Sequence, residues 1–166
     1  MNELVILVNE KDEPIGSMDK LEVHQKGLLH RAFSVFVFND AGQLLLQRRA
    51  NNKYHSAKLW TNTCCSHPYP QENTLDAAKR RLKEEMGIET NLEKKFDFIY
   101  RAQLDNNLIE HELDHVFIGQ YNDSPILNKN EASEYNWVSI SKLKYEIKQY
   151  PQKYSEWLKI AIHSFS

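Results

Sequence analysis

The stretch from residue 74 to residue 86 carries the clearest structural signal in this chain. Apolar residues recur there near helical spacing, at Leu75, Ala78, Leu82 and Met86. Asn73 or Thr74 can cap the start of such a helix, and Gly87 can end it in a left-handed conformation. The opposite face is charged, with Lys79, Arg80, Arg81, Lys83, Glu84 and Glu85. The pattern predicts an amphipathic helix that buries one side against another layer of structure.

Segments rich in β-forming residues lie on both sides of this predicted helix. They cover residues 4–8, 32–38, 43–49, 96–104, 109–121 and, briefly, 137–138. Residues 39–42 and 105–107 have the composition of turns, residues 9–16 are turn-rich around Pro14, and a short helix is expected at 19–25. From residue 141 onward we expect two helices interrupted at Pro151. Because apolar residues of 32–38 and 43–49 occur on both faces, these patterns predict an α/β (α+β) fold with a β-sheet sandwiched between helices.

Length and charge favour one domain and disfavour two classes of partner. The 166 residues contain 5 Gly and 5 Pro that are scattered rather than gathered in a linker, so we expect a single domain over residues 1–166. A core of this size buries roughly 70% of the surface that an unfolded chain exposes, so a metal ion would serve chemistry rather than folding. The formal net charge of -2, without a long basic block, disfavours nucleic acid. The longest aliphatic run, residues 4–8, is far too short to cross a bilayer.

The two cysteines, Cys64 and Cys65, are neighbours in the chain. Adjacent cysteines make a poor intrachain disulfide. Free thiols are typical of a reducing compartment, so we expect a cytoplasmic protein.

Several histidines and glutamates point to a metal site. Glu110 and Glu112 share one face of the predicted strand 109–121, about 6–7 Å apart along it, where they repel each other unless a cation or a proton lies between them. Three histidines would complete an octahedral site for Mn²⁺, Mg²⁺ or Zn²⁺: His24, His30 and His67. On spacing alone, each of these is more often an ordinary histidine of the folded protein than a metal ligand. The other four histidines receive no role, and two of them have the opposite strand parity to the glutamates and should point away: His55, His163, His111 and His115.

The segment from Ser66 to Ile88 resembles the Nudix box, G-x5-E-x7-R-E-U-x-E-E-x-G-U, in which U is aliphatic. Seven positions match in register: Glu72, Arg80, Leu82, Glu84, Glu85, Gly87 and Ile88. Two positions depart, since Ser66 replaces the glycine and Arg81 replaces a glutamate. The box places carboxylates around Mg²⁺ that bridges a diphosphate. Arg81 inverts one of those charges, which should weaken hydrolytic metal binding and add a donor for a phosphate oxygen.

The residues just before the box narrow the resemblance further. The run from Trp60 to Pro68 reads W-T-N-x-x-C-x-H-P, and with the arginine substitution it resembles type I isopentenyl-diphosphate isomerases of the Nudix superfamily. The likeness extends from about Val5 to Trp157. It implies a Nudix-type mixed β-sheet sandwiched between helices, and an enzyme that interconverts isopentenyl and dimethylallyl diphosphate through a tertiary carbocation in isoprenoid biosynthesis. The stretch between His24 and His30 is slightly short for the family, although both histidines are kept.

The resemblance also assigns roles to individual residues. Proton transfer falls to Cys65 and Glu112 with help from Tyr100, while Cys64 is assigned to packing. The metal ligands are His24, His30, His67, Glu110 and Glu112, holding Mn²⁺ or Mg²⁺, with Zn²⁺ as a third option. A second ion, Mg²⁺ carried by the diphosphate, is assigned to Glu85 and Cys65. The diphosphate faces Lys20, Arg49, Lys53 and Arg81, and the hydrocarbon faces Trp60 and Trp157, the latter on a last helix that would act as a lid.

Two other functions are compatible with the sequence. One is a Nudix hydrolase of a nucleoside or other diphosphate, which Arg81 disfavours. The other is a non-catalytic module that binds a diphosphate ligand, which the retention of Cys65 and of the glutamates disfavours. The expected partner is a small isoprenoid diphosphate, without nucleic acid or membrane. The sequence leaves the oligomeric state open, with a monomer slightly favoured.

Overall fold

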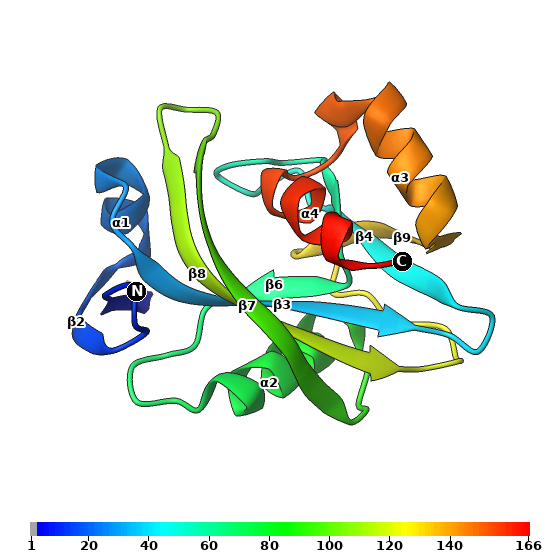
Figure 1. Ribbon diagram of the computed structural model, residues 1–166, viewed down its shortest axis with the longest axis horizontal. Coiled ribbons are helices and arrows are strands. Elements are labelled where there is room, and N and C mark those ends of the chain that lie inside the picture. The colour runs from blue at the N-terminus through cyan, green and yellow to red at the C-terminus, as the bar shows by residue number, and fades with distance from the viewer. Residues whose placement is uncertain (1–2) are drawn as a thin grey trace.

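The protein is built around one mixed nine-stranded β-sheet, seen in a computed structural model whose residues 3–166 are described here (Figure 1). The strands are β1 (Leu4–Val8), β2 (Pro14–Asp19), β3 (His30–Phe38), β4 (Gln43–Arg49), β5 (Trp60–Thr61), β6 (Cys64–Ser66), β7 (Leu92–Gln103), β8 (Ile109–Gln120) and β9 (Ala132–Ser139). The helices are α1 (Lys20–Lys26), α2 (Thr74–Met86), α3 (Ile140–Gln149) and α4 (Glu156–Ala161), with 3-10 turns at Pro151–Lys153 and Ile162–Ser164.

Strand β3 lies at the centre of the sheet. It pairs in parallel with β8, from His30 opposite Glu112 to Phe38 opposite Gln120. It also pairs antiparallel with β6, where Ser34 lies opposite Cys65. Strand β7 continues the sheet beyond β8, and β4 carries β9 and β5. This pairing brings the ends of β3 and β8 beside β6, so segments far apart in the sequence meet at one place.

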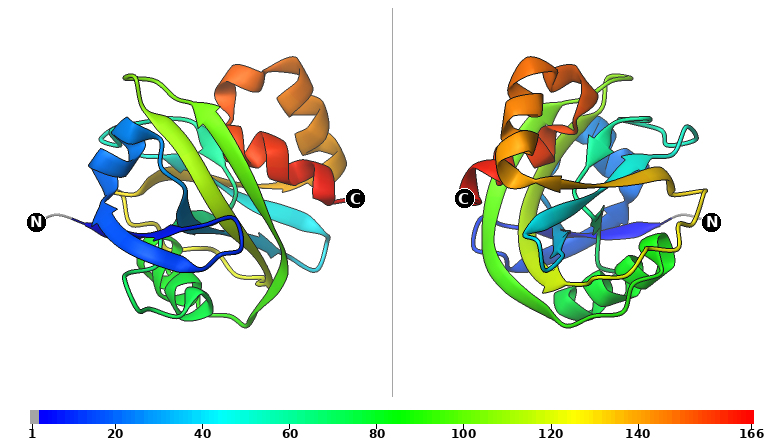
Figure 2. Two further views of the ribbon diagram at one scale, coloured as in Figure 1. Left: turned by 60° about the vertical axis from the view of Figure 1, so that its left-hand side comes forward. Right: turned by 90° about the vertical axis from the view of Figure 1, so that its right-hand side faces the viewer.

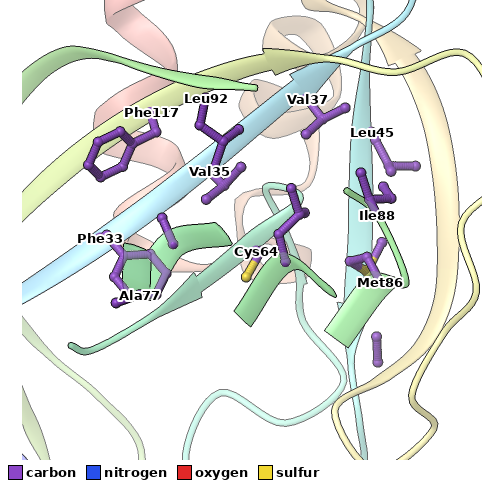
Figure 3. Packing of buried hydrophobic residues seen from close by; sticks show 13 residues of the cluster. Phe33, Val35, Val37, Leu45, Cys64, Ala77, Met86, Ile88, Leu92 and Phe117 are labelled. Carbon is purple, nitrogen blue, oxygen red and sulfur yellow. The ribbon is translucent and has the colours of Figure 1, made fainter. Parts of the chain in front are cut away.

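The two faces of β3 are covered by different helices, as Figures 1 and 2 show. Phe33, Val35 and Val37 pack with Leu82 and with other side chains of α2, and Figure 3 shows the residues of this cluster. Phe36 alternates with them and packs on the other face against residues of α3 and α4. Successive side chains of a strand point to opposite faces, so one apolar run supplies both cores. The predicted sheet sandwiched between helices is confirmed.

Helix α2 begins and ends where the sequence predicts. The Asn73 side chain accepts a hydrogen bond from the backbone N–H of Asp76 at 3.2 Å, which caps the start. Gly87 ends the helix in the left-handed conformation, with φ of 66°. A Cβ atom at Gly87 would lie 2.8 Å from the Cβ of Ile126, so both the conformation and the space require glycine. The capped helix holds its charged residues at a fixed place below the sheet.

Several strand predictions were incomplete, and β5 and β6 were not predicted. Residues 14–16, predicted as part of a turn-rich stretch, begin strand β2, and β2 lies at an edge of the sheet where a proline costs no ladder hydrogen bond. Strand β9 spans Ala132–Ser139 rather than two residues, because its exposed polar side chains conceal the strand pattern. Strand β7 begins at Leu92, four residues before the predicted start at Phe96. Between residues 3 and 166, no helix has both the length and the apolar character needed to span a bilayer.

Candidate active site

Five buried or nearly buried side chains converge where β3, β8 and α1 meet. Glu110 and Glu112 project from β8, on the same face as predicted, with 3% and 7% of their surface exposed. His30 begins β3 directly opposite Glu112. His24 comes from α1, and His67 directly follows β6. Their nitrogen and oxygen ligand atoms all lie within 4.8 Å of one another. The structure therefore brings together all five residues of the predicted metal set.

The imidazole and carboxylate groups of this cluster lie close enough to hold a proton or a cation between them. Nε2 of His24 lies 2.8 Å from Oε1 of Glu110, and Nε2 of His67 lies 3.0 Å from Oε2 of Glu112. Nε2 of His30 is 3.4 Å from a carboxylate oxygen of each glutamate and 3.2 Å from Nε2 of His67. Two imidazole nitrogens can face each other at that distance only with a proton or a cation between them.

Electrostatics favours a cation at the centre of the cluster. Burial alone would lower the pKa of His30, but its hydrogen bonds to Glu110 and Glu112, and their charges, raise that pKa to about 10. Burial would raise the pKa of Glu110, yet His24 and His30 hold it well below its usual range. Imidazole and carboxylate donors are what Mn²⁺, Zn²⁺ and related divalent ions accept. The donor set fits a divalent cation.

Two groups suited to proton transfer face one cavity of about 310 Å³. Cys65, on β6, and Glu112, on β8, both line it. The hydroxyl of Tyr100 donates to Oε1 of Glu112 at 2.7 Å, and this hydrogen bond fixes the orientation of the carboxylate. Burial raises the pKa of the Cys65 thiol, which keeps its proton on sulfur. Its neighbour Cys64 packs in the cluster that α2 covers, as Figure 3 shows.

The four basic residues predicted to face a diphosphate line the same cavity: Lys20, Arg49, Lys53 and Arg81. Carboxylates pair with three of them. Nζ of Lys20 lies 2.6 Å from Glu3. Arg81 lies 2.9 Å from Glu85 and 3.2 Å from Glu131, and Glu131 also pairs with Lys53. These charge pairs hold several phosphate donors around one cavity before any anion arrives.

Helix α2 supplies Arg81 and Glu85 to this cavity. Glu85 is buried and accepts a hydrogen bond from Nε2 of Gln47 at 3.1 Å. Glu72 does not reach the cavity lining and instead pairs with Arg80 at 2.9 Å. Thus the charged residues of the box divide into two groups: Arg81 and Glu85 line the cavity, and Arg80 and Glu72 hold the loop before the helix.

The two tryptophans predicted for the hydrocarbon lie in different environments. Trp157, on α4, lines the cavity, is 4% exposed, and has the Arg49 guanidinium 5.3 Å from its ring centroid. Trp60 is not among the cavity-lining residues; it packs with the cluster that α3 and α4 form on the sheet. The structure thus places Trp157 in the cavity wall and Trp60 outside it.

Sequence reasoning missed several residues of the cavity. His55 was given no role, yet it lines the cavity beside Trp157, with ring centroids 6.2 Å apart, and burial lowers its pKa to about 2. Tyr54 and Glu131 also line it. None of these residues lies in a motif. Only Glu131 has a feature that is visible in the sequence, because it is an acidic residue directly before strand β9. His111 and His115 do point away from the metal cluster, as strand parity predicts, toward Gly27 and Asp12.

A third carboxyl continues the face of β8 that carries Glu110 and Glu112. Asp114 is 1% exposed, and its Oδ2 accepts a hydrogen bond from Ser34 at 2.7 Å. Burial and the nearby Glu112 charge raise the pKa of Asp114 well above its usual range. Strand alternation alone places Asp114 on the same face as Glu112, two residues earlier, so this carboxyl could have been found from the sequence.

The chain is similar to known proteins over nearly its whole length. The NUDIX domain family matches residues 28–159. A protein of Photorhabdus laumondii named "Isopentenyl-diphosphate Delta-isomerase 2" is 54% identical over 166 residues, which cover 100% of this chain and 94% of the relative. A protein of Pectobacterium atrosepticum named "Isopentenyl-diphosphate Delta-isomerase" is 51% identical, covering 94% of this chain and 87% of the relative.

Solved structures show the same fold at lower identity. The crystal structure of DR0079 from Deinococcus radiodurans has a TM-score of 0.82 at 20% identity and covers 98% of each chain. That of a MutT protein from Methanosarcina mazei has a TM-score of 0.66 at 20% identity and covers 82% of this chain and 91% of that chain. The predicted Nudix-type fold is thereby confirmed.

Proposed function

This chain belongs to the isopentenyl-diphosphate delta-isomerase family of Nudix-domain proteins, and from that premise we propose that it interconverts isopentenyl diphosphate and dimethylallyl diphosphate in isoprenoid biosynthesis. Its substrate is a small diphosphate. The observation that carries the proposal is the shared cavity, in which Cys65 and Glu112 lie with four basic residues and Trp157. An isomerisation through a carbocation uses each of these groups: two proton-transfer groups, an aromatic wall and cations that hold the diphosphate.

The reaction adds one proton to the terminal carbon of the double bond and removes one from the neighbouring methylene group, so the proton count of the substrate is unchanged. Between the two steps the charge rests on a tertiary carbon. We assign the two proton transfers to Cys65 and Glu112, whose roles exchange in the reverse direction. The hydroxyl of Tyr100 orients Glu112, and the buried face of Trp157 stabilises the cationic carbon by about 1–2 kcal/mol where water is excluded.

The His/Glu cluster is proposed to hold Mn²⁺ or Mg²⁺, with Zn²⁺ as a third option, through His24, His30, His67, Glu110 and Glu112. A bound ion would supply positive charge that sets the proton affinity of Glu112. Glu85 and Cys65 are proposed to contact a Mg²⁺ ion that accompanies the diphosphate. Lys20, Arg49, Lys53 and Arg81 bind the phosphate oxygens and fix the alkene between the proton-transfer groups.

The remaining features of the proposal concern the chain as a whole. Residues 1–166 act as one Nudix-type isomerase domain, since a single sheet joins strands from both ends of the described chain. Helix α4, which carries Trp157, serves as the lid of the cavity. The enzyme works in the cytoplasm, where a reducing environment keeps the Cys65 thiol free.

The test is a matched pair of cysteine variants. Each is incubated with isopentenyl diphosphate and Mg²⁺ in deuterated water, and deuterium incorporation and the dimethylallyl product are followed by NMR. Cys65→Ala should lose at least about a hundredfold in rate, as expected for removal of a proton-transfer group. Cys64→Ala, one residue away but buried against α2, should keep turnover near that of the parent enzyme. A Cys65→Ala enzyme with near-parental turnover would remove the thiol from the mechanism.

The same incubation distinguishes the main alternative. A Nudix hydrolase would release phosphate or monophosphate from nucleoside diphosphate compounds and leave isopentenyl diphosphate unlabelled. Arg81 argues against that activity, because it places a positive charge where the Nudix box has a glutamate and so removes one carboxylate from the set that a hydrolase would use for metal binding.

A further inference from the structure

Tyr54 lies between the metal cluster and the phosphate-binding residues, on the loop that follows β4. Three hydrogen bonds hold the middle of this loop. Nδ2 of Asn106 donates to the carbonyl of Tyr54 at 3.0 Å, and Nη2 of Arg49 donates to the carbonyl of His55 at 3.1 Å. The carboxylate of Asp105 accepts from the N–H of Ser56 at 3.0 Å. These bonds fix the backbone of Tyr54, so its side chain has a defined position in the cavity.

The hydroxyl of Tyr54 contacts the outer nitrogen of one metal-cluster histidine. It lies 2.7 Å from Nδ1 of His24, whose Nε2 faces Glu110 at 2.8 Å. His30 is oriented in the same way by a backbone group, the carbonyl of Leu28, at 3.0 Å from its Nδ1. The partner of the outer nitrogen decides which ring nitrogen carries the proton and how the ring is turned. For His24 that partner is a side chain and is therefore open to substitution.

A tyrosine hydroxyl suits this position because it both donates and accepts. When Nε2–H of His24 donates to Glu110, the hydroxyl donates to Nδ1. When Nε2 presents its lone pair to a cation, Nδ1–H donates to the hydroxyl oxygen instead. Phenylalanine offers neither bond, and the outer nitrogen would then be left without this partner in a largely buried place.

The ring of Tyr54 has a second contact on the phosphate side. Nζ of Lys20 lies 5.4 Å from its centroid, within the range of a cation–π interaction. The same ammonium group pairs with Glu3 at 2.6 Å. One side chain therefore touches the metal cluster through its hydroxyl and a diphosphate-facing cation through its ring.

We propose that Tyr54 is a positioning residue that aligns His24 for metal binding through its hydroxyl and Lys20 for diphosphate binding through its ring. The assignment rests on the proposed function for the identity of the two ligands, but its geometric basis is the pair of contacts described above. The effects on metal binding and on diphosphate binding can be separated, because one substitution removes the hydroxyl alone and another removes both the hydroxyl and the ring.

The experiment compares Tyr54→Phe and Tyr54→Leu with the parent protein by titration calorimetry with Mn²⁺ alone. Loss of an outer hydrogen bond to a metal-binding histidine lowers metal affinity about 10–100-fold, and we expect that loss in both variants. The KM for isopentenyl diphosphate at saturating Mn²⁺ should change less than about twofold in Tyr54→Phe and rise about threefold or more in Tyr54→Leu, which lacks the cation–π contact. Imidazole ¹⁵N chemical shifts should report an altered His24 tautomer in Tyr54→Phe.

Tyr69→Phe is the matched control. Tyr69 is 45% exposed and stacks with Arg80, with the guanidinium 4.0 Å from its ring, outside the cavity lining. This variant should keep the parental Mn²⁺ affinity, and thermal unfolding without metal checks that all variants fold. A Tyr54→Phe protein with parental Mn²⁺ affinity and parental His24 shifts would overturn the positioning role. If the parent protein fails to isomerise the substrate while Tyr54→Phe still weakens Mn²⁺ binding, the proposed function falls and the alignment of His24 stands.

Discussion

Glu131 occupies the place where a diphosphate is proposed to bind, and its neutralisation should tighten anion binding. Its carboxylate pairs with Lys53 and with Arg81, and these contacts, with burial opposing them, lower its pKa. A diphosphate that engages the same two cations must displace this carboxylate or share them with it. The perturbation is Glu131→Gln, which removes the charge and preserves the shape.

The magnitude follows from the two contacts that the anion must replace. Hydrogen bonds to charged groups contribute about 1.5–3 kcal/mol each, but the Glu131 side chain is 21% exposed and glutamine keeps a weaker hydrogen bond. We therefore expect Glu131→Gln to gain about 1–2 kcal/mol in diphosphate binding, which is an affinity about 5–30-fold higher. The free energy of unfolding without ligand should fall by about 1 kcal/mol, because Lys53 and Arg81 lose a counter-charge.

Calorimetric titration with inorganic pyrophosphate and Mg²⁺ measures this change. Glu134→Gln is the control, since Glu134 pairs with Arg48 at 2.8 Å at an exposed position outside the cavity lining. It should leave pyrophosphate affinity unchanged. If Glu131→Gln binds pyrophosphate no more tightly than the parent protein, Glu131 does not compete with the anion and the reasoning is refuted.

Three further predictions concern stability. Gly87→Ala should lower the free energy of unfolding, measured in urea, by about 2–3 kcal/mol, because φ is 66° and the new Cβ would lie 2.8 Å from Ile126. The control Gly42→Ala, with φ of 75° and open space around it, should lower it by only about 1 kcal/mol, and equal losses would disprove the steric contribution. Burial lowers the pKa of His115, so at this residue the folded protein binds fewer protons than the unfolded chain and loses stability as the pH falls below about 6.5. His115→Gln should therefore reduce the fall in the free energy of unfolding, measured in urea, between about pH 7 and 5, and an unchanged fall would contradict this. Mn²⁺ should raise the thermal midpoint of the parent protein, and Glu110→Gln should abolish most of that rise; an equal rise in both would place the ion elsewhere.

Local patterns were sufficient for the elements whose signals are strong within a few residues. Helix α2 has its apolar stripe, its Asn73 cap and its terminal Gly87 within one short segment, and its predicted ends are confirmed. The shared face of Glu110 and Glu112 follows from strand alternation alone. Strand β2 escaped prediction because an edge strand tolerates the proline and glycine that normally indicate a turn.

The sequence by itself therefore determined the fold class, the family and most of the residues that meet at the cavity, because these depend on periodicity and on motifs whose spacing is fixed along the chain. Only the tertiary structure decided which side chains without a motif join them. Tyr54 and Glu131 line the cavity, while Trp60 lies outside the lining and packs against the cluster of α3 and α4. Such placements depend on how loops and strands from distant parts of the chain pack together, and no local pattern encodes that packing.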